Sequence, residues 1–337
     1  MYQFNPRLKT VVLIHGFWQR STTDWVVQMT KAFLHREPVN VLTVDWSSSH
    51  GNGDPFNYGR AALATERVAQ GLSSFIASLE NNSRTKFVHW PQLHLIGFNL
   101  GAHIAGQTGR ELLKKYNIHV HRITGLDPAY KCFEEKNVQL KLRKDDAQFV
   151  DIIHTSFFKR GKHILGSHEP MGTVDFYPNG GCNQPQCRHS KLMRYFKDTM
   201  RHAPSIAKPI ASVFGQIVHN VFKVDISDMI LNQMKNDYSQ MCDHDQAPKY
   251  FIESLQDDRK FLANPVSDLP IKRNIKLQCQ NRKCNDKTCV KMGIMADNNG
   301  FSSGAYYVDT TSESVNCKNI NSVENHEVDI KNAEVKL

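Results

Sequence analysis

Up to about residue 180, apolar residues follow two alternating patterns along the chain. Short apolar runs, typical of buried strands, cover residues 10–15, 41–46, 93–97, 122–127 and 149–154. Longer segments with apolar residues every three or four positions predict helices over 24–36, 58–80 and 100–116. Strands that alternate with helices in this way are typical of a mostly parallel sheet with helices on both faces. We therefore expect an α/β fold.

Three polar residues directly follow or end predicted strands. They are His15, Asn99 and Asp127. Because the carboxyl ends of parallel strands meet at one edge of the sheet, and ligands bind there, we expect these residues to converge at a functional site.

The segment Gly97-Phe98-Asn99-Leu100-Gly101 lies between a predicted strand and a predicted helix. This is the layout of a nucleophile elbow, Gly-x-Ser-x-Gly, in which a sharp turn exposes a serine hydroxyl. Here Asn99 stands at the serine position, and a carboxamide attacks a carbonyl carbon poorly. Asparagine tolerates the positive φ that such a turn needs, so the fold can persist while acyl transfer is lost.

Beyond residue 180 the pattern changes, and the stretch between Cys187 and Cys242 contains an amphipathic segment. Its apolar positions include Phe214, Ile217, Val218, Val221 and Phe222. One interpretation is a pair of helices packed into the core. The other is a mobile lid over a lipid pocket, whose apolar face alternates between the pocket and a membrane.

The 337-residue chain carries a net charge of +9 and contains 40% hydrophobic residues, without an apolar run long enough to span a bilayer. A basic stretch over 188–201 suits an anionic membrane surface or a sulfated glycan, or is simply a solvated face. No nucleic-acid-binding motif accompanies the charge. The start of the chain shows no signal-peptide pattern.

The eight cysteines are Cys132, Cys182, Cys187, Cys242, Cys279, Cys284, Cys289 and Cys317. An even number with local clustering predicts disulfides and therefore a secreted protein. A zinc site is the competing interpretation of the late cluster. The spacing of its cysteines and the lack of a nearby pair of histidines disfavour zinc.

Seven blocks of this sequence resemble, in order, those of the animal pancreatic-lipase family of α/β-hydrolases. They are Val12–Phe17, His94–Gly106, Ile123–Ala129, Asp146–Thr155, Asp175–Gly181, Cys242–His244 and Met292–Gly293. The resemblance implies a single α/β-hydrolase domain over 4–312 with a long helical lid insertion over 188–241. The polar composition beyond Cys317 predicts a disordered tail over 318–337, and, as a departure from the larger lipases of the family, we expect no C-terminal β-sandwich domain.

The resemblance also assigns roles to individual residues. Asp127 would orient the imidazole of His244, the catalytic base, and the backbone N–H groups of Phe17 and Leu100 would form the oxyanion hole. His103 and His154 are expected to be packed or structural. The implied disulfides are Cys187–Cys242 and Cys284–Cys289, while the pairing of Cys132, Cys182, Cys279 and Cys317 stays open.

Two departures from the family pattern affect function. Asn99 removes the nucleophile, and Arg143 and Val138 stand near Asp146 where calcium ligands are expected, so we expect neither metal nor cofactor. The leading hypothesis is an inactive protein that binds or carries a lipid or acyl ester. The alternatives are an active secreted triacylglycerol lipase or phospholipase A1-type ester hydrolase, and a module that binds glycans or partners through 188–201. The sequence indicates no oligomeric state.

Overall fold

A computed structural model describes nine stretches of the chain. They are residues 4–50, 58–82, 92–133, 139–157, 165–187, 241–258, 260–266, 290–297 and 303–311. Several predicted features lie outside these ranges: the apolar lid residues Phe214, Ile217, Val218, Val221 and Phe222, the basic stretch 188–201, the Cys284–Cys289 pair, and the tail 318–337. In the described part, none of the helices is long and apolar enough to cross a membrane.

The described strands form one nine-stranded sheet with the order β2-β1-β3-β4-β5-β6-β9-β7-β8. Their bounds are β1 Thr10–Ile14, β2 Asn40–Val44, β3 Leu93–Phe98, β4 Arg122–Leu126, β5 Phe149–Ile153, β6 Val174–Pro178, β7 Leu262–Val266, β8 Val290–Lys291 and β9 Gly304–Val308. All pairs from β2 to β9 are parallel, whereas β7 pairs antiparallel with both β9 and β8. The mostly parallel sheet expected from the sequence is therefore confirmed.

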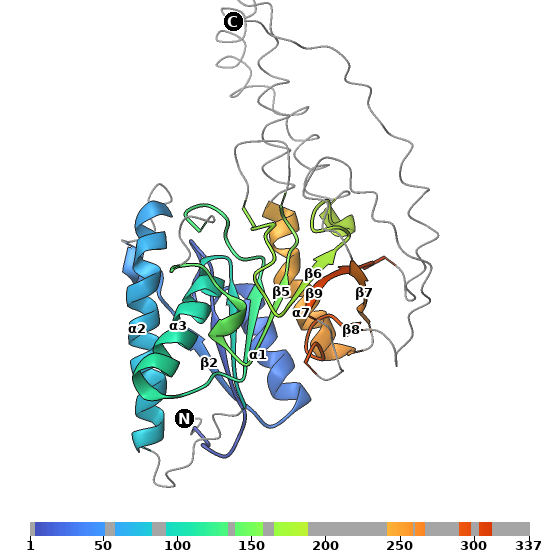
Figure 1. Ribbon diagram of the computed structural model, residues 1–337. Coiled ribbons are helices and arrows are strands. Elements are labelled where there is room, and N and C mark those ends of the chain that lie inside the picture. The colour runs from blue at the N-terminus through green and yellow to red at the C-terminus, as the bar shows by residue number, and fades with distance from the viewer. Residues whose placement is uncertain are drawn as a thin grey trace, which may run out of the picture.

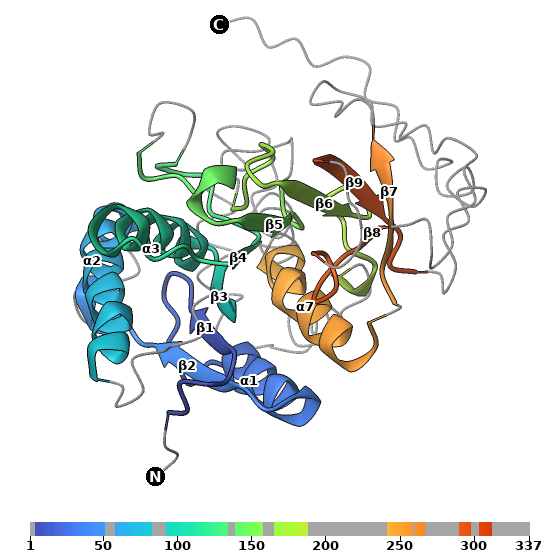
Figure 2. The same cartoon turned by 60° about the horizontal axis from the view of Figure 1, so that its bottom comes forward.

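Helices cover both faces of this sheet, as Figures 1 and 2 show. The described helices are α1 Asp24–Arg36, α2 Tyr58–Asn82, α3 Leu100–Tyr116 and α7 Gln246–Gln256, with short 3-10 turns η1 Ser47–His50, η4 Lys144–Asp146 and η5 Pro185–Cys187. Helices α2 and α3 pack on one face around a core that includes Leu95 and Ile104, and α1 and α7 pack on the other around Phe33 and Phe251. This is the α/β-hydrolase fold.

Two details of the predicted pattern are wrong. Strand β2 is mostly half-buried rather than buried, because among the described strands it lies at the end of the order and pairs only with β1. In α2, the apolar spacing that predicts the helix over 58–80 includes Leu72, Phe75 and Ile76. Leu72 and Ile76 are buried, but Phe75 is 50% exposed because it points away from the face that packs on α3.

The register places the carboxyl ends of the central strands side by side. Ile14 pairs with Gly97, Phe98 with Leu126, and Leu126 with Ile153. The residues that follow these strands therefore emerge at one edge of the sheet, where ligands bind in open α/β sheets.

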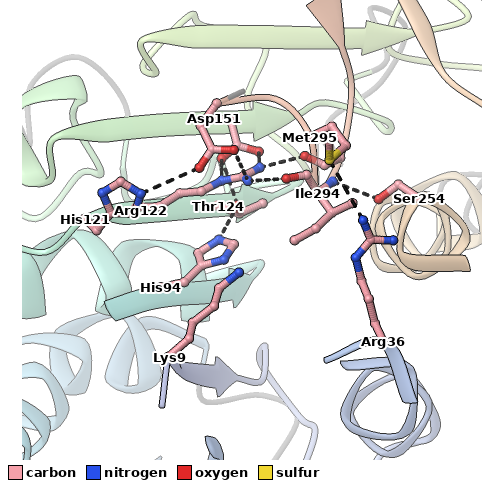
Figure 3. Close-up of polar contacts among 12 residues, drawn as sticks. Lys9, Arg36, His94, His121, Arg122, Thr124, Asp151, Ser254, Ile294 and Met295 are labelled. Carbon is pink, nitrogen blue, oxygen red and sulfur yellow. Dashed lines mark hydrogen bonds and ion pairs between the residues drawn. The ribbon is translucent and has the colours of Figure 1, made fainter. Parts of the chain in front are cut away.

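The amino ends of the same strands hold a buried polar network, drawn in Figure 3. The Arg122 guanidinium makes two hydrogen bonds to Asp151, at 2.8 and 3.0 Å, and donates to the carbonyls of Gly293 and Ile294 at 2.6 and 2.7 Å. A single arginine at the start of β4 thus ties the distant 290–297 segment to the centre of the sheet.

The same network also fixes the imidazole of His94. Thr124 donates its hydroxyl hydrogen to Asp151 at 2.8 Å, so its oxygen accepts from Nε2 of His94 at 2.8 Å. Burial, with the positive charges of Arg122 and Lys9, lowers the pKa of His94 well below its usual value, so this imidazole is neutral. A polar cavity of about 330 Å³ opens beside it, lined among others by Lys9, Arg36 and Asp297.

Candidate active site

The turn between β3 and α3 holds Asn99 in a backbone conformation that few residues adopt. Its φ is 56° and its ψ is −116°. The two flanking glycines allow this turn, because a β-carbon at Gly97 would collide with the carbonyl of Gly101, and one at Gly101 with that of Ile14. Asn99 is one of the non-glycine residues that tolerate positive φ, so the local geometry is that of an elbow with an amide at its tip.

The Asn99 side chain is anchored at both of its polar atoms. Its Oδ1 accepts a hydrogen bond from the backbone N–H of Phe17 at 3.3 Å, and its Nδ2 lies 3.0 Å from Nε2 of His244. Asn99 and His244 are both only 8% exposed. The carboxamide therefore bridges the loop after β1 and the imidazole at the start of the α7 region.

His244 is bound on its other nitrogen by Asp127. The Nδ1···Oδ2 distance is 2.5 Å, and Phe98 packs against the imidazole with 4.4 Å between ring centroids. An ionised carboxylate can only accept hydrogen bonds, so Nδ1 of His244 carries the proton and Nε2 offers a lone pair toward Asn99. The structure thus brings Asn99, His244 and Asp127 together in the order expected for a nucleophile position, a base and its orienting acid.

The Asp127 carboxylate is fully buried and satisfied by nearby donors. Its Oδ1 accepts from the N–H of Thr155 at 2.7 Å and of Ser156 at 3.2 Å, and its Oδ2 accepts from the Ser156 hydroxyl as well as His244. A β-carbon at Gly166 would collide with the carboxylate, so the backbone passes close by. Among the described residues, the only ion pair that Asp127 forms is with His244.

A disulfide and one carboxylate position the segment that carries His244. Cys187 and Cys242 form a disulfide across a sequence separation of 55 residues, with Cα atoms 5.7 Å apart. The adjacent Asp243 accepts from the backbone N–H groups of Asn183 at 2.9 Å and Gln184 at 2.8 Å. These contacts tie the chain just before His244 to the loop after β6.

The two residues expected to supply the oxyanion hole lie on either side of Asn99. Leu100 begins α3, where the N–H groups of the first turn have no partner inside the helix. Phe17 follows Gly16, whose N–H donates to Gln19 at 3.1 Å, and Gln19 also accepts from Trp25. The Phe17 N–H itself is directed at Asn99 Oδ1.

The other singled-out histidines are structural. His103 bonds the carbonyl of Ala129 at 2.8 Å and the N–H of Leu142 at 3.1 Å, and burial lowers its pKa to about 3. His154 lies 2.9 Å from Asp175, and His15 accepts from the N–H of Trp46. The backbone of His15 therefore follows β1 at the carboxyl edge of the sheet, as expected, but its imidazole is buried against Trp46 and faces the core.

Asp146 is held by an arginine. Nη1 of Arg110 lies 2.6 Å from both of its oxygens, and the N–H of Arg143 donates to it at 2.8 Å. Within the stretches that the structure describes, no cluster of histidine, cysteine and acidic side chains could hold a metal ion. Val138 lies outside those stretches.

Comparison with known proteins finds lipases among the relatives of this chain. The family model described as lipase matches residues 1–202. Lipoprotein lipase of Neovison vison is 31% identical over 293 residues, and pancreatic lipase-related protein 2 of Mus musculus 32% over 292, covering 84% and 86% of this chain. Lipase member H of Oryctolagus cuniculus is 38% identical over 197 residues, which cover 57% of this chain and 40% of that protein. The chain spans 51% of the length of each of the first two relatives.

Proposed function

Since this chain belongs to the lipase family, we propose that it is a catalytically inactive member that binds a lipid or an acyl ester. The observation that carries the proposal is the position of the Asn99 carboxamide between Phe17 and His244. In a serine hydrolase, the base takes a proton from a hydroxyl at this position as an acyl-enzyme forms. Asn99 has no hydroxyl and occupies the lone pair of His244 Nε2 with its own N–H.

A neighbouring hydroxyl does not replace the missing nucleophile. Ser156 Oγ lies 3.4 Å from His244, but at Nδ1, on the side of the ring that faces Asp127. Its hydrogen is donated to Asp127, and the residue is 1% exposed. An attacking group must meet both the base at Nε2 and an incoming carbonyl, and Ser156 can meet neither.

The second candidate function is active ester hydrolysis by a triacylglycerol lipase or phospholipase A1-type mechanism. The pairing of His244 with Asp127 favours it, because a carboxylate that holds an imidazole in this way is the arrangement of a catalytic base and its orienting acid. Asn99 weighs against it, and we rank it below lipid binding for that reason.

The compartment and further partners belong to the same proposal. The Cys187–Cys242 disulfide supports an extracellular location, because such bonds persist mainly in oxidising environments. The net charge of +9 supports contact with an anionic membrane surface or a sulfated glycan, with the basic stretch 188–201 as the proposed contact.

An ester-hydrolysis assay tests the inactive state. The unmodified protein and the Asn99→Ser variant are incubated with short- and long-chain fluorogenic esters. We expect turnover from Asn99→Ser only, because the residual effect of a site without its nucleophile is about 10³-fold over water and too small to observe as turnover. The matched control is Asn99→Ser combined with His244→Ala, which should be silent. Turnover by the unmodified protein that is abolished by His244→Ala would overturn the proposal.

A further inference from the structure

We infer that Asn99 makes this site insensitive to the ester carbonyl of its ligand, so that ether-linked and ester-linked lipids of equal chain length bind alike. The carboxamide of Asn99 takes the place that the ligand's carbonyl would take in a hydrolase. This inference rests on the proposed lipid-binding function and names the ligand class it implies: glycerolipids recognised by their chains, whether ester or ether bonds join those chains to glycerol.

The orientation of the carboxamide follows from its two partners. The Phe17 N–H can only donate, so it must meet Oδ1, at 3.3 Å. His244 Nδ1 is protonated toward Asp127, so Nε2 can only accept, and it must meet Nδ2, at 3.0 Å. A flipped amide would set acceptor against acceptor and donor against donor. The network as a whole therefore admits one orientation.

This orientation places a carbonyl oxygen where an oxyanion hole receives one. A ligand's ester carbonyl that approached the Phe17 N–H would first have to displace Asn99 Oδ1. It would exchange one hydrogen bond for another of the same kind, and the displaced amide, in a site only 8% exposed, would lose its partner. At the Phe17 N–H, the ester oxygen therefore gains nothing over the ether, which carries no carbonyl.

The local backbone holds the Asn99 carboxamide rigidly at the Phe17 N–H. The β-carbon of Asn99 is fixed by the elbow, and any β-carbon at Gly16 would lie 2.9 Å from it, so the loop carrying Phe17 approaches Asn99 closely. With both side-chain ends bonded and the Cα fixed by the turn, the amide has no alternative position that keeps its two hydrogen bonds. Asn99 is thus a specificity-determining residue rather than only an absent nucleophile.

Binding of a matched lipid pair tests the inference. Dissociation constants are measured for dioctanoylglycerol and for its dioctyl ether analogue, with the unmodified protein, with Asn99→Gly and with the control Asn117→Gly. Glycine keeps the positive φ of the elbow and opens the hole without creating a nucleophile, so the ester survives the measurement. Asn117 lies in a left-handed helix cap far along α3 and is not part of the site.

We expect the unmodified protein and Asn117→Gly to bind the two lipids within about twofold of each other. Asn99→Gly should shift the ratio of dissociation constants toward the ester by about five- to tenfold, the value of one ordinary hydrogen bond. A preference for the ester in the unmodified protein as large as in Asn99→Gly would overturn the inference and leave lipid binding intact. An unchanged ratio in Asn99→Gly would overturn it as well. Binding of neither lipid by any variant would overturn the proposed function, and the inference with it.

Discussion

The two ends of the central sheet each join a buried histidine to a buried aspartate, and they do so in opposite ways. At the amino ends, His94 reaches Asp151 through the hydroxyl of Thr124, and Arg122 pairs with that aspartate. At the carboxyl ends, His244 contacts Asp127 directly, and the other donors to Asp127 are the neutral groups of Thr155 and Ser156.

The difference lies in where the aspartate's charge is balanced. Arg122 balances Asp151, so His94 gains no ionic partner and stays neutral in its buried position. Within the described residues, Asp127 forms an ion pair only with His244, so its carboxylate lies directly against that imidazole. Among the described residues, His154 also pairs with a buried aspartate, Asp175, at 2.9 Å, so what distinguishes His244 is that its other ring nitrogen faces Asn99 at the elbow.

The largest expected effect concerns Asp127. In the Asn99→Ser background, Asp127→Asn should lower ester turnover by about 10⁴-fold, because the amide no longer holds the imidazole in the tautomer with Nδ1 protonated. Steady-state hydrolysis of a fluorogenic ester measures this change.

Asp151→Asn in the same background is the matched control at the other end of the sheet. It should destabilise the protein yet leave turnover within about threefold at a temperature where the variant is folded. Equal losses of turnover from Asp127→Asn and Asp151→Asn would show that the two ends of the sheet do not differ in this way.

A smaller effect is expected from the amino-end network itself. Arg122→Met should lower the free energy of unfolding by about 3–5 kcal/mol, because it leaves the fully buried Asp151 without its charged partner. Urea denaturation followed by tryptophan fluorescence measures the change. The exposed pair Lys260–Glu253 provides the control, since Lys260→Met should change stability by at most about 1 kcal/mol.

The smallest effect is a dependence of stability on pH. The pKa of His94 is lowered in the folded protein, so below its unfolded value of about 6.5 only the unfolded chain takes up this proton. Stability is then complete above that pH and falls by about 1.4 kcal/mol per pH unit below it. His94→Gln should remove this contribution to the pH dependence of stability. The separate contribution of His103, whose pKa burial lowers to about 3, should remain. An unchanged slope in His94→Gln would show that His94 is not buried neutral.

Most of the fold was predictable because its elements have strong local signals. The helices over 24–36 and 100–116 have the predicted bounds, and the predicted strands lie within two residues of the bounds of β1 to β5. Strands β6 to β9 were not predicted, and β8 is only the dipeptide Val290–Lys291. The failures are tertiary in origin. The position of β2 at the end of the strand order and the outward direction of Phe75 depend on which neighbours other segments provide.

The site was predictable only as far as motifs reach. Asn99 follows from its elbow, and Asp127 and His244 from a family resemblance. Ser156 and Asp243 carry no such signal, because their contacts join loops far apart in the chain. A faint indication existed for Ser156, which follows the end of a predicted strand, as Asn99 and Asp127 do. The sequence gives no warning that Arg122 donates hydrogen bonds to Asp151, to Asp297 and to two carbonyls, since a basic residue at a strand start usually faces water.

The positive φ of Asn99 has an evolutionary consequence. Asparagine codons and two serine codons differ by a single base, and both residues can occupy an elbow that the flanking Gly97 and Gly101 already permit. Exchange between serine and asparagine at this position therefore needs one substitution and no rebuilding of the scaffold. Under the proposed inactive function, the Asn99→Ser change alone would supply the missing hydroxyl beside His244 and Asp127.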